Sequence, residues 1–500
     1  MACLYMAWPR FNRKDILTAL LLLFGFLIIR LINLTIIPIF TDEAIYLRWA
    51  QIAKNDASWR FISLTDGKQP LFVWLTMVMM KLVADPLVAG RLVSVGAGLV
   101  SMVTTWWLAW VFFKNKKVSF LASFFYLLYP FAMIYDRMAL MDSLVGTFSL
   151  LSLLLAVLLV KTLRLDIALI LGFALGGGVL TKTSGFLSIY FLPLTLILFD
   201  WRRKNQRWRL LAWLGLTVLA VFISQLFYLV LRLSPLFNMI SQKDTTFVYP
   251  FKDWLEHPLT FLWGNLKGEL DWLRRYLTWP WLLLVFSSFF WKKYLKERLL
   301  LFGWFLASFT ALALFGRVLY PRFIFFMTLP LLILAAYSFN RLAQRLAKRF
   351  LVFAFCILIF AFILYFNYQI LFNPPQAPIT FSDKSQYVTS WPSGIGIKEM
   401  IVLLETKAAK QPILVATEGT FGMFPASIEL YLWDNDNVEI KSYWPVNEIN
   451  QELIDKAALR PVYFVFNETR DIPKEWPLEL VAEYPKIQRP YSLRLYQVKP

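Results

Sequence analysis

Histidine and cysteine are nearly absent from this sequence. Its 500 residues include one histidine, His257, and two cysteines, Cys3 and Cys356. A single histidine excludes a metal site built from several imidazoles and disfavours catalysis by a histidine base. Because Cys356 stands inside an apolar run, no disulfide framework is expected, and the cysteines do not identify a redox compartment.

Acidic residues are also scarce, with 32 Asp and Glu against 51 Lys and Arg, which gives a net charge of +19. Such an excess can indicate nucleic-acid binding, but here the cations gather in short loops between apolar runs. The chain is 59% hydrophobic, with a mean hydropathy of +0.57, well above the usage of soluble proteins. Apolar runs long enough to cross about 30 Å of hydrocarbon recur from Ile16 to Tyr368. The sequence predicts a polytopic α-helical membrane protein and no nucleic-acid partner.

The first apolar run lacks the short core and small-residue cleavage site of a secretory signal, so it is expected to be a retained helix. The positive-inside rule places the basic loops near 10–14, 114–117, 161–164, 202–209, 292–298 and 341–349 in the cytoplasm. If all these loops lie on one side, the chain must cross the membrane an even number of times between neighbouring loops. Three apolar runs separate the first loop from the second, so one of the three does not cross. Pro70–Ala84 is the shortest, begins with proline and contains Lys81, so we expect it to be interfacial or re-entrant.

This parity argument predicts about eleven transmembrane helices in the plasma membrane, with the N-terminus inside and the C-terminus outside. The expected spans are 16–38, 88–113, 118–135, 143–160, 165–181, 184–200, 210–231, 279–291, 299–315, 320–339 and 349–370.

The composition changes near Phe372, where Asn373–Pro378 is a proline-rich linker. Beyond it, four β-rich runs (413–417, 438–444, 462–466 and 493–498) alternate with helical patterns at 396–407 and 448–458. We therefore expect a transmembrane domain over 1–371, with a first external loop at 41–87. An extracytoplasmic soluble α/β domain is expected over 372–500.

The acidic pair Asp42-Glu43 follows the first apolar run and is expected on the outer face. Carboxylates at a membrane boundary are costly, which makes them candidates for a functional site. Asp42 and Glu43 can serve as a base or as metal ligands. Thr41-Asp42-Glu43 is also a good helix N-terminus, and for the isolated pair helix capping and catalysis are about equally favoured.

Further charged residues fall on the same predicted face. Several cations at a membrane boundary suit an anionic phosphate headgroup, and a nearby carboxylate suits deprotonation of an acceptor hydroxyl or amine. A phosphate leaving group needs charge stabilisation, which fixed cations supply. The candidate substrate-binding residues are Lys68, Arg137, Asp142, Lys182, Tyr320 and Arg322.

Each of these residues also has an ordinary structural interpretation. Lys68 can be a snorkelling anchor, and Arg137 with Asp142 can form a helix-end ion pair. Gly176–Gly178 suits helix packing, which we expect to be its main role. Arg322 is on the wrong predicted side for a topogenic flank. Location on one predicted face favours the functional interpretation.

At these residues the chain resembles the GT-C glycosyltransferases, in particular the protein O-mannosyltransferases (family 39-like) and the lipid A aminoarabinose transferases. The resemblance covers roughly residues 10–370 and rests on the ordered set of motifs more than on any one of them. The motifs are Asp42-Glu43-Ala44-x-Tyr46, Gly67-Lys68-x-Pro70-Leu71, Arg137-x-Ala139-x-x-Asp142 and Thr181-Lys182-x-Ser184-Gly185.

The resemblance implies inverting transfer of a sugar from a polyprenyl-phosphate donor on the outer face, and interfacial helices in the first external loop. It implies that Asp42 is the general base with Glu43 beside it, and that Arg137 and Asp142 shape the sugar site. Lys68, Lys182 and Arg322 would hold the donor phosphate.

The chain departs from the family pattern at two places, which leave the acceptor open. Gln69 stands where a second proline is common in the aminoarabinose group, and the tail lacks a β-trefoil pattern. A bacterial or archaeal origin is expected.

Two other classes of function remain open from the sequence. A transporter or lipid flippase would place charges near the bilayer midplane and often has inverted repeats, neither of which the sequence indicates. A non-catalytic scaffold or receptor is the other. We predict no obligatory cofactor, although Asp42, Glu43 and Asp142 could bind a divalent metal if they converge. The expected partners are the lipid-linked donor, the bilayer and an unidentified acceptor.

Overall fold

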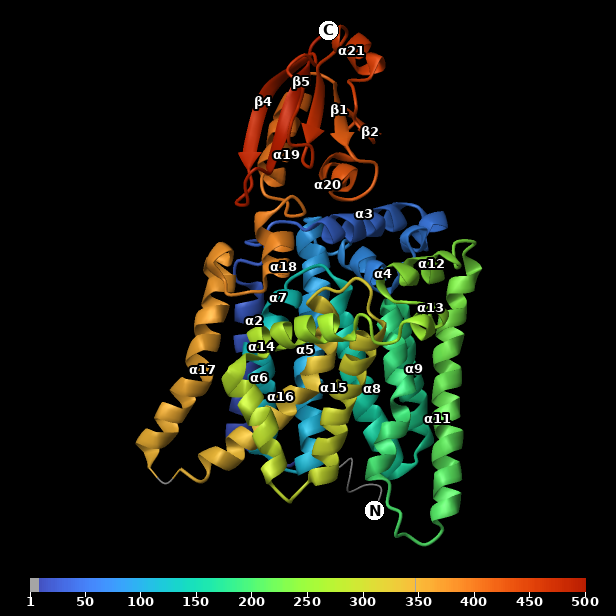
Figure 1. Cartoon of the computed structure of the whole chain (residues 1–500), viewed down its shortest axis with the longest axis vertical. Helices are drawn as coiled ribbons and strands as arrows, with labels where there is room; N and C mark the ends of the chain where they lie inside the picture. The colour runs from blue at the N-terminus through green and yellow to red at the C-terminus, as the bar shows by residue number, and fades with distance from the viewer. Residues whose placement is uncertain (1–8, 347) are drawn as a thin grey trace. The chain divides into compact units, whose positions relative to one another are not determined.

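The computed structural model describes residues 9–346 and 348–500, so that Cys3 lies outside the described residues. The chain forms two compact units. The first comprises residues up to Ile32, Arg60–Leu75 and Arg91–Asn373, and it is helical (Figure 1). The second comprises Asn33–Trp59, Thr76–Gly90 and Pro374–Pro500, so it joins two early segments to the C-terminal region.

Helical segments of the first unit overlap each apolar run expected to span the membrane, although several of these runs are divided between two or more helices. Those that carry the bundle are α2 (Arg13–Leu31), α5 (Pro86–Phe113), α6 (Lys116–Leu128), α7 (Pro130–Tyr135), α8 (Met141–Thr162), α9 (Leu165–Thr181), α11 (Gln206–Leu229), α14 (Leu262–Ser287), α15 (Leu295–Phe315), α16 (Arg322–Ala343) and α17 (Arg349–Phe372). The run 184–200 is broken into η3 (Thr183–Gly185), α10 (Phe186–Tyr190) and η4 (Leu192–Leu198).

Six helices of the described chain are long and apolar enough to cross a membrane. They are Pro86–Phe113, Met141–Thr162, Gln206–Leu233, Leu295–Phe315, Arg322–Ala343 and Phe350–Phe372. The protein therefore has the helices of a multi-pass membrane protein, while a total of about eleven spans stays a prediction. Helix α4 (Leu71–Met79) has nine residues, about 14 Å at 1.5 Å per residue, too short to cross as expected for that segment.

Burial distinguishes the core helices from the lipid-facing ones. Helices α8 and α16 are buried along most of their length, whereas α11 and α17 expose large apolar side chains such as Leu214 and Phe353. A membrane would cover those exposed faces. Figure 1 shows α8, α9 and α11 in sequence across one side of the bundle, and their glycines explain the close packing. A Cβ on Gly172 or Gly176 would lie 2.7 Å from Ile223 or Phe227 of α11, so the packing role predicted for the glycine run is confirmed.

The segment between α11 and α14 holds two short helices that the sequence interpretation passed over. They are α12 (Met239–Phe247) and α13 (Phe251–Glu256). Helix α14 then bends at Thr278, whose φ of 64° is non-helical, two residues before Pro280. The expected span 279–291 therefore corresponds to the part of α14 after this bend, followed by η6 (Ser288–Phe290).

The second unit contains a five-stranded mixed sheet in the order β2-β1-β3-β5-β4. Strands β1 (Ile413–Glu418), β2 (Val438–Tyr443) and β3 (Val462–Phe466) are parallel, and β5 (Ser492–Val498) runs antiparallel between β3 and β4 (Leu478–Pro485). Strands β1 and β3 are buried throughout because they are central. The predicted α/β pattern is confirmed, but β4 was missed because it is an edge strand with exposed charges.

Helices complete the second unit. Helix α3 (Thr41–Asn55) packs on α20 (Met423–Leu432), which the sequence interpretation also missed. The other helical segments are η1 (Ala57–Trp59), η7 (Pro374–Gln376), α18 (Phe381–Lys384), the π-helical turn η8 (Ser385–Thr389), α19 (Ile397–Ala408) and α21 (Gln451–Ala457). Helix α3 and the C-terminal sheet thus belong to one compact unit, although they are far apart in the sequence.

Candidate functional site

Lys182 and Asp142 form an ion pair in the first unit. Lys182 is the C-cap residue directly after α9 and Asp142 lies in the first turn of α8, with 2.8 Å between Nζ and Oδ1. Asp142 is 5% exposed and Lys182 26%. A carboxylate is favoured in the first turn of a helix because the aligned peptide dipoles are positive there. Asp142 therefore pairs with Lys182, and not with Arg137 as the helix-end interpretation considered.

The other candidate cations meet around two aromatic rings, Phe247 of α12 and Phe323 of α16, whose centroids are 5.8 Å apart. Lys182 Nζ lies 4.5 Å from the Phe323 centroid, and Lys68 Nζ lies 4.7 Å from the Phe247 centroid. Cations over ring faces are attracted by the negative face of the π-system.

Arg322 completes this arrangement at the start of α16. Its Cζ lies 5.9 Å from the Phe323 centroid and 5.3 Å from that of Tyr320. We call Lys68, Lys182 and Arg322, gathered around these rings, the cation cluster. With Tyr320, which lies beside Arg322, four of the predicted substrate-binding residues meet here. A fifth, Asp142, joins them through its ion pair with Lys182.

A glycine allows the loop that carries Lys68 to approach α12. Gly67 has a φ of +63°, and a Cβ there would lie 2.4 Å from the carbonyl oxygen of Met239. Its neighbour Asp66 accepts a hydrogen bond from Lys243 of α12 at 2.6 Å. The Gly-Lys motif thus combines a left-handed turn with a close backbone contact, which only glycine satisfies.

A chain of polar contacts links the same loop to η3 and α12. Gln69 Nε2 donates to Thr183 Oγ1 at 2.7 Å, and Thr183 Oγ1 donates to Asp244 at 3.0 Å. Burial raises the pKa of Asp244, while the Thr183 hydrogen bond and Lys68 act in the opposite direction. Phe247, Phe323 and Asp244 were missed from the sequence, since no motif marks them and only the folded contacts reveal them.

Arg137 is placed at the end of α2. Its Nη1 donates to the carbonyl oxygens of Ile29, Arg30 and Ile32 at 2.8 to 3.0 Å. These carbonyls have no intrahelical partners at a helix C-terminus, so the guanidinium caps α2. The contacts assigned to Arg137 are therefore structural, and its predicted part in the sugar site stays a prediction.

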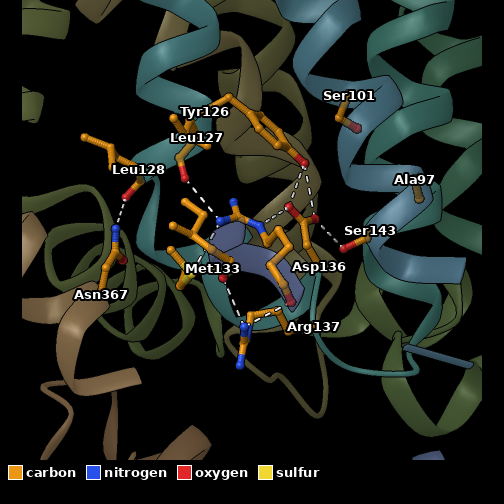
Figure 2. A network of polar contacts seen from close by, with 12 residues as sticks. Ala97, Ser101, Tyr126, Leu127, Leu128, Met133, Asp136, Arg137, Ser143 and Asn367 are labelled. Carbon is orange, nitrogen blue, oxygen red and sulfur yellow. Dashed lines mark hydrogen bonds and ion pairs between the residues drawn. The ribbon is translucent and has the colours of Figure 1, made fainter. Parts of the chain in front are cut away.

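Next to Arg137, a buried polar network joins α2 to α6–α8 (Figure 2). Arg30 Nε donates to Asp136 Oδ2 at 3.1 Å, and both side chains are 0% exposed. Tyr126 and Ser143 also donate to Asp136. A Cβ on Gly98 would lie 2.4 Å from the Asp136 carboxyl carbon, so this glycine makes room for the network.

The acidic pair belongs to the second unit, in the first turn of α3. Glu43 is buried, and its Oε2 accepts a hydrogen bond from the backbone N–H of Phe40 at 2.9 Å. Asp42 is half-buried. The structure thus divides the pair: Glu43 caps its own helix, whereas Asp42 is the more accessible carboxylate.

Outside residues 1–8 and 347, no group of three or more His, Cys, Asp and Glu side chains comes together in a way that could hold a metal ion.

Comparison with known proteins identifies the fold. Residues 67–228 match the family model described as dolichyl-phosphate-mannose-protein mannosyltransferase. Among curated proteins, sequence comparison finds no significant match.

Three solved structures are similar over most of this chain. ArnT from Cupriavidus metallidurans, bound to undecaprenyl phosphate, has a TM-score of 0.59 at 14% identity, with 96% of this chain and 97% of that chain covered. The Archaeoglobus fulgidus oligosaccharyltransferase has a TM-score of 0.52 at 12% identity, with 91% and 69% covered. The mycobacterial arabinofuranosyltransferase AftD has a TM-score of 0.50 at 12% identity, with 98% and 40% covered. The expected resemblance is confirmed: the chain is a membrane protein with the GT-C fold of these glycosyltransferases.

Proposed function

We propose that the protein is an inverting glycosyltransferase that moves a sugar from a polyprenyl-phosphate donor to an acceptor on the outer face of the plasma membrane. The cation cluster carries this proposal. Three cations around a pair of aromatic rings in a GT-C fold suit the phosphate of a lipid-linked sugar. The resemblance to a bound ArnT structure supports the same class of lipid carrier.

In the proposed reaction, an acceptor hydroxyl or amine attacks the anomeric carbon of the donor sugar. The bond between that carbon and the phosphate oxygen breaks, and Asp42 takes the acceptor proton. The polyprenyl phosphate leaves with its added negative charge compensated by Lys68, Lys182 and Arg322. One displacement inverts the anomeric configuration. Asp142 holds the Lys182 ammonium in place at 2.8 Å.

The test of the proposed base is Asp42→Asn in purified protein. The probes are radiolabelled hexoses and pentoses on undecaprenyl phosphate, with cell-envelope lipids and proteins as acceptors. We expect Asp42→Asn to lower turnover by at least about 100-fold, the usual contribution of a general base. The matched control is Asp56→Asn at the other end of α3, whose carboxylate accepts hydrogen bonds from Ser58.

Donor binding tests the cation cluster separately. We expect Lys68→Met and Arg322→Met each to weaken undecaprenyl phosphate binding by roughly tenfold to a hundredfold, since charged hydrogen bonds contribute about 1.5–3 kcal/mol. Lys252→Met, at an exposed lysine of α13, is the control. Near-normal turnover of Asp42→Asn would remove it from the mechanism, and movement of the labelled lipid across proteoliposomes without a covalent product would favour a flippase.

A further inference from the structure

Within the second unit, a segment of the C-terminal region is paired with the residues that precede Asp42. We call Trp391–Ile395 the clasp. Phe40 and Ser393 form an antiparallel bridge, and the Gly394 N–H donates to the Ile39 carbonyl at 2.7 Å. Thr41 donates both its N–H, at 3.2 Å, and its hydroxyl, at 3.1 Å, to the Pro392 carbonyl.

Glycine at position 394 is required for this approach. A Cβ on Gly394 would lie 2.5 Å from both the carbonyl oxygen and Cγ2 of Ile39. The backbone of residues 39–41 therefore contacts the backbone of the clasp directly, and the clasp fixes Phe40 and Thr41. Because Phe40 is the N-cap of α3 and its N–H is bound by Glu43, the clasp fixes the start of the helix that carries Asp42.

The C-terminal sheet holds the other side of the clasp. Lys486 follows β4, is 2% exposed, and donates from Nζ to the Ser393 carbonyl at 2.7 Å and the Ile395 carbonyl at 2.8 Å. Asn467 follows β3, is 3% exposed, and donates from Nδ2 to the Trp391 carbonyl at 3.0 Å. Both contacts reach the clasp from residues that directly follow a strand of the sheet.

The turn that carries Asn467 is itself held by a buried carboxylate at the end of β1. Glu418 accepts hydrogen bonds from the backbone N–H groups of Asn467, Glu468 and Thr469 at 2.7 to 2.8 Å. Charge-assisted hydrogen bonds of this kind are among the stronger ones in proteins. The polar connection thus runs from the sheet, through the clasp, to the residues before Asp42.

A lysine is an expensive choice at position 486. Burial lowers the pKa of Lys486 to about 7, and its partners are two neutral carbonyls. An apolar side chain there would avoid the cost of desolvating an ammonium group. The ammonium group of Lys486 is explained if its hydrogen bonds to the Ser393 and Ile395 carbonyls serve function at a cost in folding stability.

The middle of α3 is fastened to the same domain. Arg48 pairs with Glu429 of α20 at 2.8 Å, and Gln51 Nε2 donates to the Leu430 carbonyl at 3.1 Å. Trp49 also contacts the Phe421 ring, with centroids 6.3 Å apart. Helix α3 is therefore held at its start by the clasp and along its length by α20.

We propose that the C-terminal sheet domain positions the acidic pair, and that Lys486 is a positioning residue which acts on Asp42 through the clasp. The inference rests on the proposed function in so far as Asp42 is the base. It assigns a role to a domain whose sequence did not indicate one.

The experiment compares Lys486→Met with Thr41→Val, which removes one hydroxyl contact at the opposite side of the clasp. Lys499→Met is the control, because Lys499 follows β5 and its side chain is 57% exposed. Hydrogen exchange followed by mass spectrometry reports on peptides covering 38–46 and 390–397 without any substrate. We expect exchange there to rise about tenfold in Lys486→Met and less in Thr41→Val, as for loss of two or one hydrogen bonds. Lys499→Met should match the wild type.

Turnover with the lipid-linked donors gives the second readout. We expect kcat to fall about tenfold in Lys486→Met with little change in KM, and the double variant to lose less than the product of the single losses. Unchanged hydrogen exchange in both clasp variants would overturn the proposal. A double variant whose loss of kcat equals the product of the two single losses would also overturn it. If Lys486→Met does not fold, Thr41→Val decides by the same two readouts. A wild type without transfer activity refutes the proposed function, whereas the exchange result still decides whether the clasp holds α3.

Discussion

At the residue scale, Arg30 and Asp136 illustrate how a charged pair is kept inside the helical unit. Both side chains are fully enclosed, and Tyr126 and Ser143 supply further hydrogen bonds to the carboxylate. Desolvation makes such a pair a poor source of stability, but removal of one partner leaves an uncompensated charge. The pair joins α2 to the turn that precedes Arg137, so it holds the end of α2 in register.

We expect Asp136→Asn or Arg30→Met to destabilise the protein by about 3–5 kcal/mol, as for other broken buried pairs. Thermal unfolding in detergent measures this loss. The combined variant Arg30→Met/Asp136→Asn should lose less than the sum of the two. Asp166→Asn is the matched control, since the Arg164–Asp166 pair is exposed and such pairs contribute about 0–1 kcal/mol. Equal losses at both sites would contradict the role of burial.

Glu269 of α14 is a buried carboxyl of another kind. It is 0% exposed, and neither carboxyl oxygen has a hydrogen-bond partner among the described residues. Burial raises the pKa of Glu269 to about 8. Between the unfolded pKa of 4.5 and this value, the folded protein holds a proton that the unfolded chain releases, so stability falls as pH rises.

Glu269→Gln removes this titration, and we expect it to stabilise the protein more at about pH 8.5 than at about pH 5. The gain should grow by up to roughly 1.4 kcal/mol per pH unit across that window. Melting temperatures in detergent at the two pH values check it. Glu256→Gln, at an exposed glutamate of α13, is the control and should show no such trend. A gain that is equal at both pH values would show that Glu269 is not protonated in the folded state.

The sequence separated functional from structural residues only in part. It indicated Asp42 and Glu43 together, because both stand at a helix start, and only the Phe40 hydrogen bond shows that Glu43 is the cap. It also linked Arg137 with Asp142 by spacing, whereas Asp142 contacts Lys182, forty positions away in the chain. Side-chain partners across such separations depend on helix packing, which no local pattern encodes.

At the element scale, glycine decides how closely α9 and the broken segment after it pack. A Cβ on Gly185 would lie 2.3 Å from the backbone carbonyl of Gly178, and backbone atoms cannot move aside as a side chain does. Gly178 precedes Lys182 by one helical turn. The Thr-Lys-x-Ser-Gly motif therefore ends in a glycine because the chain folds back on its own helix.

We expect Gly185→Ala to lower the melting temperature by several degrees and to weaken undecaprenyl phosphate binding, since it shifts the turn that carries Lys182. Overpacking of this kind typically costs about 1–3 kcal/mol. Gly215→Ala on α11 is the control: nothing lies within 4 Å of its Cβ, and alanine favours a helix. A variant Gly185→Ala as stable as Gly215→Ala would show that the backbones do not approach this closely.

Long apolar helices were predictable, and short amphipathic ones were not. A run such as Met141–Thr162 has enough length for its composition to indicate a helix. Helices α12 and α13 have nine and six residues, too few for a period to stand out. Yet α12 supplies Phe247 and Asp244 to the candidate site, so two of the three site residues that the sequence missed lie on a helix that it also missed. The third, Phe323, lies on the predicted helix α16.

At the scale of the whole molecule, the division of the chain does not follow its linear order. The sequence suggested a boundary near 371 and 372, where a proline-rich linker begins. The compact units instead assign Asn33–Trp59 and Thr76–Gly90 to the same unit as Pro374–Pro500. A composition change locates a linker, but backbone pairing such as that of Phe40 with Ser393 has no linear signature.

The orientation in the membrane is the remaining prediction at this scale, and it follows from where the cations lie. Arg202, Arg203 and Lys204 form part of a basic loop before α11, and retention of such loops in the cytoplasm would place the C-terminal domain outside. Single cysteines at two exposed lysines, Lys204→Cys and Lys499→Cys, test this in a background where Cys3 and Cys356 are serine.

We expect a membrane-impermeant maleimide to label Lys499→Cys in intact cells and Lys204→Cys only after the membrane is permeabilised. The cysteine-free background is the control for specificity. The reverse result, with Lys204→Cys labelled in intact cells and Lys499→Cys only after permeabilisation, would place the basic loops outside. The cation cluster would then lie on the cytoplasmic face. Labelling of both positions in intact cells would require an odd number of crossings to be added or removed between α11 and the C-terminus. The parity argument that excluded Pro70–Ala84 from the spans would then have no basis, because it assumes that every basic loop lies on one side.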